Sequence, residues 1–490
     1  MILGKKPVCC SAVCLWKGHD LNAKDLLRLG VPLGEATRRA TDFVCSFILG
    51  GGDKARLATE VRAVVANPTA FVDDPLRGAF ARALVEAPPP PRAEPVAYQR
   101  WGEGLEPEAV MQMEKACLLP VAVAGALMPD AHVGYGLPIG GVLATERAVI
   151  PYAVGVDIAC RMKMTVLDLP VHDLDRKRDR LVRAIETETR FGVGACFQDR
   201  RSHDVMDADW SVSPVTQRLK DKAWAQLGTS GSGNHFVEFG LLTAHGPLRG
   251  PDESGELPAG TYLALLSHSG SRGTGAAVCD YYSKRAISGL GALPKELKRL
   301  AWLPLDSQEG QEYWQAMELM GRYAAANHAC IHGHIAEHLG AQVLLDLENH
   351  HNFAWKERHA VGGIERELIV HRKGATPAGA GMMGIIPGSM AAPGFIVRGK
   401  GNPASLHSAS HGAGRVMSRA QAIKTFEWKQ VKAFLRERGV TLISAGLDEA
   451  PMVYKNIREV MAAQSDLVTI LGQFDPKLVK MAPPGDRAED

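Results

Sequence analysis

An acid and a thiol stand three residues apart in the stretch Gly155-Val-Asp157-Ile-Ala-Cys160. A carboxylate and a thiolate at this spacing can face one metal ion if the chain bends sharply between them. Gly155 suits such a bend because a residue without Cβ tolerates unusual backbone angles. The soft sulfur favours Zn, Mn, Fe or Co over Mg or Ca. Taken alone, the same pattern is also typical of a buried cysteine beside a capping aspartate.

Three later stretches each place a histidine after an apolar, strand-like segment or in a glycine-rich turn. His235 ends the turn 231–235, His268 follows the apolar run 262–266, and His351 follows the run 343–347. Imidazole and thiolate together suit Mn, Zn, Fe or Co. Two such metals about 4 Å apart can stabilise both oxygens of a phosphoryl displacement. The spacing therefore predicts one or two metal ions, with a bridging thiolate, held by Asp157, Cys160, His235, His268 and His351.

His411 has a different setting, between the small residues Ser410 and Gly412 and four positions before Arg415. A neutral imidazole is nucleophilic near pH 7. Backbone N–H groups of a tight turn, together with Arg415, can take the charge that develops on a phosphoryl oxygen. We therefore predict that His411 attacks phosphorus. On the residues alone, a sixth metal ligand and a phosphate-binding histidine remain open as alternatives.

Composition and breaks in the pattern divide the chain into three parts. Residues 1–86 read as a small, mainly helical extension, with helical spacing over 53–66. Residues 87–96 form a proline-rich linker, because consecutive prolines cannot continue a helix. Residues 97–490 carry the reactive side chains in loops after short strands, expected at 121–127 and 148–156, and on a long helix over 311–339. This mixture predicts an α+β enzyme whose site is built from loops.

Charge and cysteine content narrow the class of protein. The 490 residues are 46% hydrophobic and 22% charged, with a formal net charge of +2, which excludes a histone-like polycation. No apolar run reaches the roughly 18 residues that a membrane span needs, and no signal peptide is recognisable. The nine cysteines, including Cys9, Cys10 and Cys14, are therefore expected to be free thiols in the cytoplasm.

Many ordered motifs between about Tyr98 and Lys480 resemble the RtcB family of RNA ligases. They are Asp130-Ala-His132-Val-Gly, Gly155-Val-Asp-Ile-x-Cys160, Gly231-Ser-Gly-Asn-His235-Phe-x-Glu238, His268-Ser-Gly-Ser-Arg272-Gly, His351-Asn352, Arg372-Lys-Gly-Ala375, Ile386-Pro-Gly-Ser-Met390, His411-Gly-Ala-Gly-Arg415-x-Met-Ser-Arg419 and Met461-Ala-Ala-Gln-Ser-Asp-Leu467. The resemblance implies an RtcB-like α+β fold, with a β-rich core, surrounding helices and a dinuclear metal site. The first 95 or so residues lie outside it.

The resemblance also implies a reaction. Such ligases join RNA ending in a 3′-phosphate or 2′,3′-cyclic phosphate to RNA with a 5′-hydroxyl, using GTP and two Mn²⁺ ions, in RNA repair or tRNA splicing. By that likeness His411 becomes guanylylated, and Cys160 bridges the two ions held by the five ligands above. An archease-type activator is a further implied partner.

The remaining site residues are carried over from the same likeness. Those matched to GTP or GMP contacts are Asn234, Glu238, Ser389, Met390, Gly412, Ala413, Gly414 and Lys480. Those matched to phosphate or RNA contacts are Arg272, Arg372 and Arg415.

One departure from the family concerns the residue after the bridging thiolate. The family usually has glycine there, whereas this chain has Arg161, which we expect to narrow the site or contact a phosphate. Two alternatives to a ligase stay open. One is a metal-dependent phosphoesterase that opens cyclic phosphates with the same five ligands and needs no adduct on His411, and the other is a homologue, catalytically weakened by Arg161, that binds RNA ends.

Overall fold

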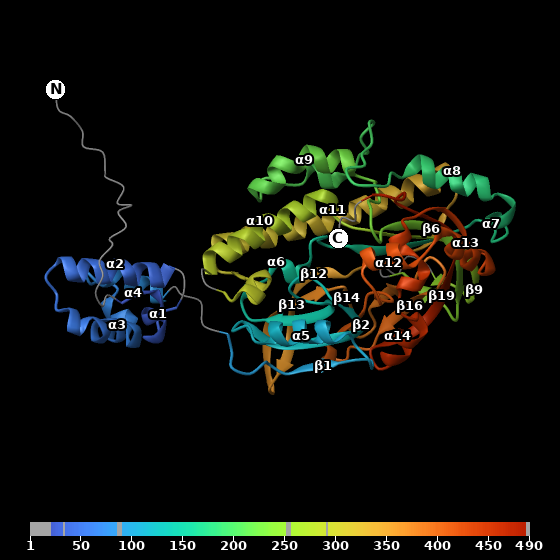
Figure 1. The fold of residues 1–490 in the computed structure, drawn as a ribbon. Helices are drawn as coiled ribbons and strands as arrows, with labels where there is room; N and C mark the ends of the chain where they lie inside the picture. Colours follow the sequence, from blue (N-terminus) through green and yellow to red (C-terminus); the bar gives the residue numbers. More distant parts are fainter. Residues whose placement is uncertain (1–20, 33–34, 86–90, 251–255, 291–292, 487–490) are drawn as a thin grey trace, which may run out of the picture. The chain divides into compact units, whose positions relative to one another are not determined.

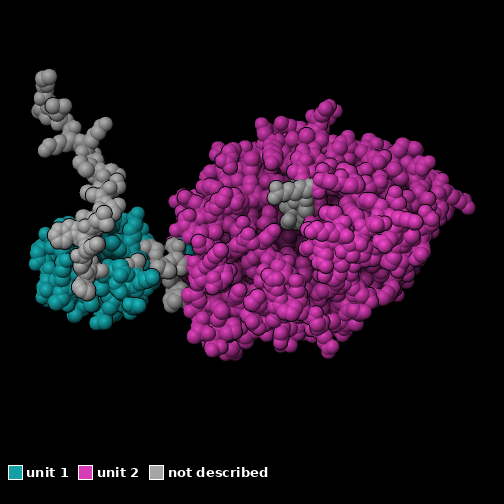
Figure 2. Space-filling view, viewed as in Figure 1, with its two compact units in different colours: residues 1–89, 290–292 teal, residues 90–289, 293–490 magenta. Residues whose placement is uncertain are grey.

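The computed structural model describes residues 21–32, 35–85, 91–250, 256–290 and 293–486. Cys9, Cys10, Cys14 and the first prolines of the linker lie outside these residues. The chain divides into two compact units, residues 1–89 with 290–292 and residues 90–289 with 293–490 (Figures 1 and 2). Each unit is described below by itself.

The N-terminal unit is helical. Its helices are α1 (Ala23–Arg28), α2 (Glu35–Leu49), α3 (Leu57–Ala66) and α4 (Gly78–Val85), with short 3-10 turns η1 (Lys54–Arg56) and η2 (Pro68–Phe71). Leu57, Val61 and Val64 are buried in its core, as residues spaced three and four apart on one helical face must be. The helix predicted over 53–66 is confirmed from Leu57 onward, whereas residues 54–56 form a 3-10 turn capped by Asp53.

The larger unit contains two main sheets. The first has the order β1-β2-β3-β13-β12, made of β1 (Tyr98–Arg100), β2 (Ala122–His132), β3 (Ile139–Thr145), β13 (Ile364–Lys373) and β12 (Asn352–Val361). Only β1 and β2 are parallel, and the other pairs are antiparallel.

The second sheet has the order β11-β5-β9-β6-β19-β16-β15, with β18 (Thr441–Ser444) paired to β19. Its strands are β11 (Val343–His350), β5 (Arg161–Leu167), β9 (Gly260–Ser269), β6 (Phe236–Ala244), β19 (Val468–Met481), β16 (Gly394–Gly399) and β15 (Met383–Ile386). Its two edges approach each other, because the side chain of Asn349 on β11 accepts a hydrogen bond from the backbone N–H of Ile385 on β15 at 2.8 Å. The sheet is therefore nearly closed.

Helices cover these sheets. In Figure 1, α8 (Arg178–Glu188), α9 (Pro214–Gln226), α10 (Arg272–Leu290) and α11 (Gln308–His338) lie along one side of the unit. Ile331 and Ile335 of α11 pack with Leu181 of α8 against Leu263 and Leu265 of β9. The other helices are α5 (Pro107–Cys117), α6 (Pro151–Val154), α7 (Asp173–Arg176), α12 (Arg419–Thr425), α13 (Trp428–Glu437) and α14 (Ile457–Ala463). The predicted α+β class, a β-rich core with surrounding helices, is confirmed.

The short elements complete the unit and correct one prediction. The short strands are β4 (Ala148–Val149), β7 (Leu248–Arg249), β8 (Glu256–Leu257), β10 (Leu303–Pro304), β14 (Ala375–Pro377) and β17 (Ser408–Ser410). The strand predicted over 148–156 was wrong beyond Val149, because Pro151 occupies the first turn of α6, where its missing N–H costs nothing. Within the described residues, no helix combines the length and the apolar character that crossing a membrane requires.

Candidate active site

The predicted metal ligands lie in turns and at strand ends of the second sheet. Asp157 and Cys160 occupy the turn between α6 and β5, which begins at Gly155 with φ of 114°. This left-handed angle is the sharp bend that the sequence predicts. His235 precedes β6, His268 lies near the end of β9, and His351 stands between β11 and β12. All five side chains are buried.

The ligand atoms form two clusters that share one sulfur. Asp157, Cys160 and His235 offer atoms within 4.8 Å of one another, and so do Cys160, His268 and His351. The Sγ of Cys160 lies 3.4 Å from Nε2 of His235 and 3.1 Å from Nε2 of His268. The Nε2 atoms of His268 and His351 are 3.1 Å apart. Cys160 is thus placed to bridge two ions.

The protonation of these groups suits metal binding. Burial lowers the pKa of His268 to about 3 and that of His351 well below its ordinary value, so both rings are neutral at pH 7. Burial alone would raise the pKa of Asp157, but its contact with His235 outweighs this and lowers it to about 2. A neutral imidazole and an ionised carboxylate are the forms that bind a metal.

Neighbouring groups hold the ligands in place. The Nδ1 of His268 donates to the carbonyl oxygen of Asn234 at 3.1 Å, which leaves the Nε2 lone pair for a metal. The backbone N–H of Ser271 donates to Oδ1 of Asp157 at 3.0 Å. A Cβ at Gly270 would lie 2.1 Å from Oδ2 of the same carboxylate, so only glycine fits there.

The residues present fit a bound metal. Nδ1 of His351 is a buried polar atom without a hydrogen-bond partner among the described residues, whereas Oδ2 of Asp157 lies 3.1 Å from Nε2 of His235. A buried polar atom without a partner is costly unless something else satisfies it. A thiolate, three imidazoles and one carboxylate form a donor set for borderline divalent metals rather than for Ca²⁺.

His411 lies at the edge of this centre, in the turn after β17. Its Nδ1 lies 2.7 Å from Oδ2 of Asp130, which is fully buried on β2. Burial alone would raise the pKa of Asp130, but the hydrogen bond from His411 lowers it, so the carboxyl is ionised. The ionised carboxylate accepts the proton of Nδ1, and the Nε2 lone pair is therefore free. The ring of His411 lies 5.0 Å from that of His351, centre to centre.

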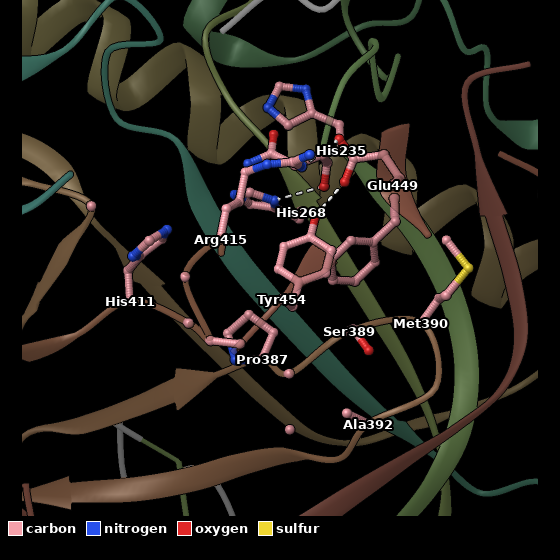
Figure 3. Close-up of a pocket in the computed structure, with 18 of the residues that line it drawn as sticks. His235, His268, Pro387, Ser389, Met390, Ala392, His411, Arg415, Glu449 and Tyr454 are labelled. Carbon is pink, nitrogen blue, oxygen red and sulfur yellow. Dashed lines mark hydrogen bonds and ion pairs between the residues drawn. The ribbon is translucent and has the colours of Figure 1, made fainter. Parts of the chain in front are cut away.

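A cavity of about 160 Å³ joins these groups. Besides the five ligands and His411, it is lined by most of the residues predicted to contact the nucleotide, namely Asn234, Glu238, Ser389, Met390, Gly412, Ala413 and Gly414. Arg415 lines it too, and Figure 3 shows Arg415 beside Glu449 and Tyr454. Burial raises the pKa of Glu238 well above its ordinary value.

Three predicted contacts do not line the cavity. Lys480 pairs with Val237 across β19 and β6, and its ammonium lies 3.2 Å from Glu186 of α8. Arg372 is fully buried and holds both carboxylate oxygens of Glu357, at 2.6 and 3.0 Å. Arg272 begins α10, with Nη1 3.2 Å from Nδ1 of His235. Arg272 and Arg372 are both buried, and each contacts another side chain in this structure.

Arg161 does not lie where the sequence analysis expects it, at the wall of the site. Its guanidinium donates to Oε1 of Glu348 at 3.0 Å and to the carbonyl oxygen of Gly321 on α11 at 2.8 Å. It does not line the cavity, because β5 begins at Arg161 and directs alternate side chains to opposite faces. The expected narrowing of the site was wrong.

Sequence reasoning gave no role to several residues of the cavity wall, among them His132, Glu449 and Tyr454. His132 stands in the Asp130-Ala-His132 motif, so its spacing from Asp130 was a usable signal. Glu449 is buried, and it contacts Arg419, the hydroxyl of Tyr454 and, at 3.4 Å, Arg415. No spacing in the sequence connects Glu449 and Tyr454 with the motifs around them.

Two other histidine groups have structural explanations. His328 and His332 of α11 both contact the hydroxyl of Ser267 on β9 at 2.7 Å, so their spacing of four residues joins a helix to a strand. Glu357, His359 and His407 also offer atoms within 4.8 Å of one another. The carboxylate of Glu357 already accepts hydrogen bonds from both terminal guanidinium nitrogens of Arg372. A metal ion bound by Glu357, His359 and His407 would have to displace that guanidinium.

Known proteins are similar to this chain over the residues that form the site. A family model described as tRNA-splicing ligase RtcB matches residues 112–213 and 202–481. The RNA-splicing ligase RtcB of Escherichia coli K12 is 36% identical over 409 residues, covering 77% of this chain and 95% of the relative. The RNA-splicing ligase RtcB of Mycobacterium bovis is 31% identical, covering 75% and 99%. The tRNA-splicing ligase RtcB of Methanococcus maripaludis is 30% identical, covering 78% and 92%. With its cluster of Asp, Cys and His ligands in a mixed α+β unit, this chain belongs to the RtcB family of tRNA-splicing ligases.

Proposed function

We propose that this chain is a GTP- and Mn²⁺-dependent RNA ligase that joins a 3′-phosphate or 2′,3′-cyclic phosphate end to a 5′-hydroxyl end. The observation that carries the proposal is the pairing of His411 with Asp130 beside two ligand clusters that share Cys160. His411, the five proposed metal ligands and further polar residues such as Asn234, Glu238 and Ser389 line one cavity, which supports the proposal.

The chain's own residues would carry the reaction in three steps. Nε2 of His411 attacks the α-phosphorus of GTP, forming a P–N bond while the bond to diphosphate breaks. The GMP group then passes to an oxygen of the RNA 3′-phosphate, which frees His411. Finally the 5′-hydroxyl loses its proton and attacks the activated 3′-phosphorus, and GMP leaves. A cyclic end is first opened by water to the 3′-phosphate.

Asp130 supports the first and second steps. The imidazole becomes cationic when Nε2 bonds to phosphorus, and the ionised Asp130 carboxylate beside Nδ1 stabilises that charge. Bound Mn²⁺ would supply positive charge to the phosphoryl oxygens. Asn234, Glu238, Ser389 and Met390 line the remaining wall, and we assign the nucleotide to that wall.

The direct test is covalent labelling of the full chain with GTP and Mn²⁺, followed by intact mass measurement. We expect wild type to gain the mass of one GMP and His411→Ala to gain none. His407→Ala is the matched control, because His407 contacts His359 and does not line the cavity. Unlabelled wild type, or equal labelling of His411→Ala, would contradict the proposal. Hydrolysis of cyclic phosphate that survives His411→Ala would favour the phosphoesterase instead. Stimulation by an archease-type protein is measurable in the same assay.

A further inference from the structure

A second and larger cavity, of about 580 Å³, lies between α5, α10 and the turn η4 (Lys295–Leu300). Its cations are Lys115, Lys284, Lys295, Lys298 and Arg299, and its carboxylates are Glu108, Asp280 and Glu296. We call this cavity the basic groove. Lys284 and Asp280 form an ion pair at 2.8 Å, which leaves four cations facing two carboxylates. The groove therefore carries net positive charge.

Most of these cations are available to a ligand. Lys295, Lys298 and Arg299 are exposed. Among the residues that the structure describes, Lys115, Lys295 and Lys298 have no acidic group within 4.0 Å of the ammonium. Cations that are neither buried nor paired stay hydrated in the free protein, and they can exchange water and counterions for phosphate oxygens.

One loop joins the basic groove to the reaction cavity. His132 and Ile139, at the ends of the loop 133–138, line the cavity of His411. Gly134 and Gly136, inside the loop, line the basic groove. Gly136 and Ile139 are three residues apart, and three residues of extended chain span at most about 10 Å. A single-stranded RNA that leaves the reaction cavity along this loop therefore reaches the groove within a few nucleotides. Lys373, buried on β13, holds the loop by donating to the carbonyl oxygen of Tyr135.

The same loop carries an aromatic platform. Tyr135 stands between Gly134 and Gly136 and is 53% exposed. The guanidinium of Arg299 lies 4.5 Å from the centre of its ring. An aromatic ring beside a line of cations is the arrangement by which proteins hold single-stranded nucleic acid, with bases stacked on the ring and phosphates on the cations.

We propose that the basic groove holds the single-stranded RNA next to the end being joined, with Tyr135 and Arg299 stacking on one base. This inference rests on the proposed function and extends it with an RNA path outside the reaction cavity. The contacts are to phosphates and to a ring face, so the groove selects single strands without selecting their sequence.

The test is equilibrium binding of a short fluorescent single-stranded RNA with a 3′-phosphate, measured by anisotropy at several salt concentrations. We expect Tyr135→Ala to weaken binding roughly 10-fold and Tyr135→Phe to bind as wild type, because stacking needs the ring and not the hydroxyl. Combined Lys295→Ala, Lys298→Ala and Arg299→Ala should also reduce the slope of log K against log salt by about 2, since each lost single-strand phosphate contact removes about 0.7. Arg285→Ala is the matched control, because Arg285 lies on α10 outside the groove and pairs with Glu309 at 3.3 Å.

Binding is measured without catalysis, so its outcome is separate from that of the proposed function. Wild type that binds RNA but never becomes labelled by GTP would contradict the ligase proposal without contradicting the proposal that the groove binds RNA. Groove variants that bind RNA with unchanged affinity and unchanged salt slope would overturn the proposal that the basic groove binds RNA. In joining assays the groove variants should raise KM for RNA while self-labelling by GTP, which needs no RNA, proceeds and confirms that they are folded.

Discussion

One carboxylate oxygen, Oδ2 of Asp130, accepts two hydrogen bonds from His411, one from the ring Nδ1 at 2.7 Å and one from the backbone N–H at 3.1 Å. The contact fixes the rotamer and the tautomer of the imidazole together. It also joins β2 of the first sheet to the turn after β17, which are 281 residues apart in the chain.

Asp130→Asn should therefore impair the nucleophile without disturbing the metal centre. An amide in this place can donate to Nδ1, which favours the tautomer whose Nε2 carries a proton and cannot attack. We expect single-turnover labelling by GTP to slow by at least about 100-fold. The metal content should stay that of wild type. Labelling at the wild-type rate would show that Asp130 does not set the tautomer.

The shared sulfur of Cys160 predicts an unequal loss of metal among ligand variants. Cys160 belongs to both clusters, whereas His235 and His351 each belong to one. After reconstitution with Mn²⁺, elemental analysis should find about two ions in wild type, about one in His235→Ala or His351→Ala, and roughly none in Cys160→Ala. Equal loss in the three variants would contradict a bridging role for the thiolate.

Arg161→Gly should cost stability instead of restoring activity. Its buried guanidinium holds Glu348 at 3.0 Å and the carbonyl of Gly321 at 2.8 Å. Because Glu348 is 39% exposed, water screens part of the pair. We expect the free energy of unfolding in urea to fall by about 2 kcal/mol, with no gain in RNA joining. Faster joining by the glycine variant would revive the idea that Arg161 obstructs the site.

Lys480→Met should leave GTP labelling close to that of wild type. The ammonium of Lys480 lies beside Glu186 and over the ring of Phe191, on the face of β19 away from the cavity. Glu238→Ala, which removes a cavity-lining carboxyl, is the comparison and should raise the GTP concentration needed for half-maximal labelling about 10-fold or more. Equal losses in both variants would place Lys480 at the nucleotide after all.

Acid should weaken the support formed by Glu357 and Arg372. Burial alone would raise the pKa of Glu357, but the hydrogen bond with His359 and the charge of Arg372 lower it from 4.5 to about 2. A carboxyl with a lowered pKa stabilises the fold above pH 4.5, and that stabilisation is lost as pH falls toward 2. The loss amounts to about 3 kcal/mol. Urea unfolding of wild type and Glu357→Gln across this range should converge toward low pH; a constant difference would contradict the assignment.

Much of the fold class and of the metal cluster was readable from the sequence because each ligand follows a recognisable strand or glycine turn. The side-chain direction on β19 was not readable. The register between β19 and β6 shifts between Pro476 and Leu478, which places Val479 opposite Glu238 and Lys480 opposite Val237. A shift of one residue reverses which face each side chain takes. The pairing of Arg372 with Glu357 was likewise not readable, because nothing in the sequence connects the two residues.

The position of β19 has a consequence for how the protein is made. Strand β19 is the last strand of the described residues, yet it lies between β6 and β16. A ribosome must therefore translate through residue 481 before the two halves of the sheet can join, and until then both leave an open edge that other chains can pair with. Cells that make this enzyme in quantity should depend on chaperones that shield those edges during synthesis, and release of a nascent chain ahead of its final strand should send it to degradation.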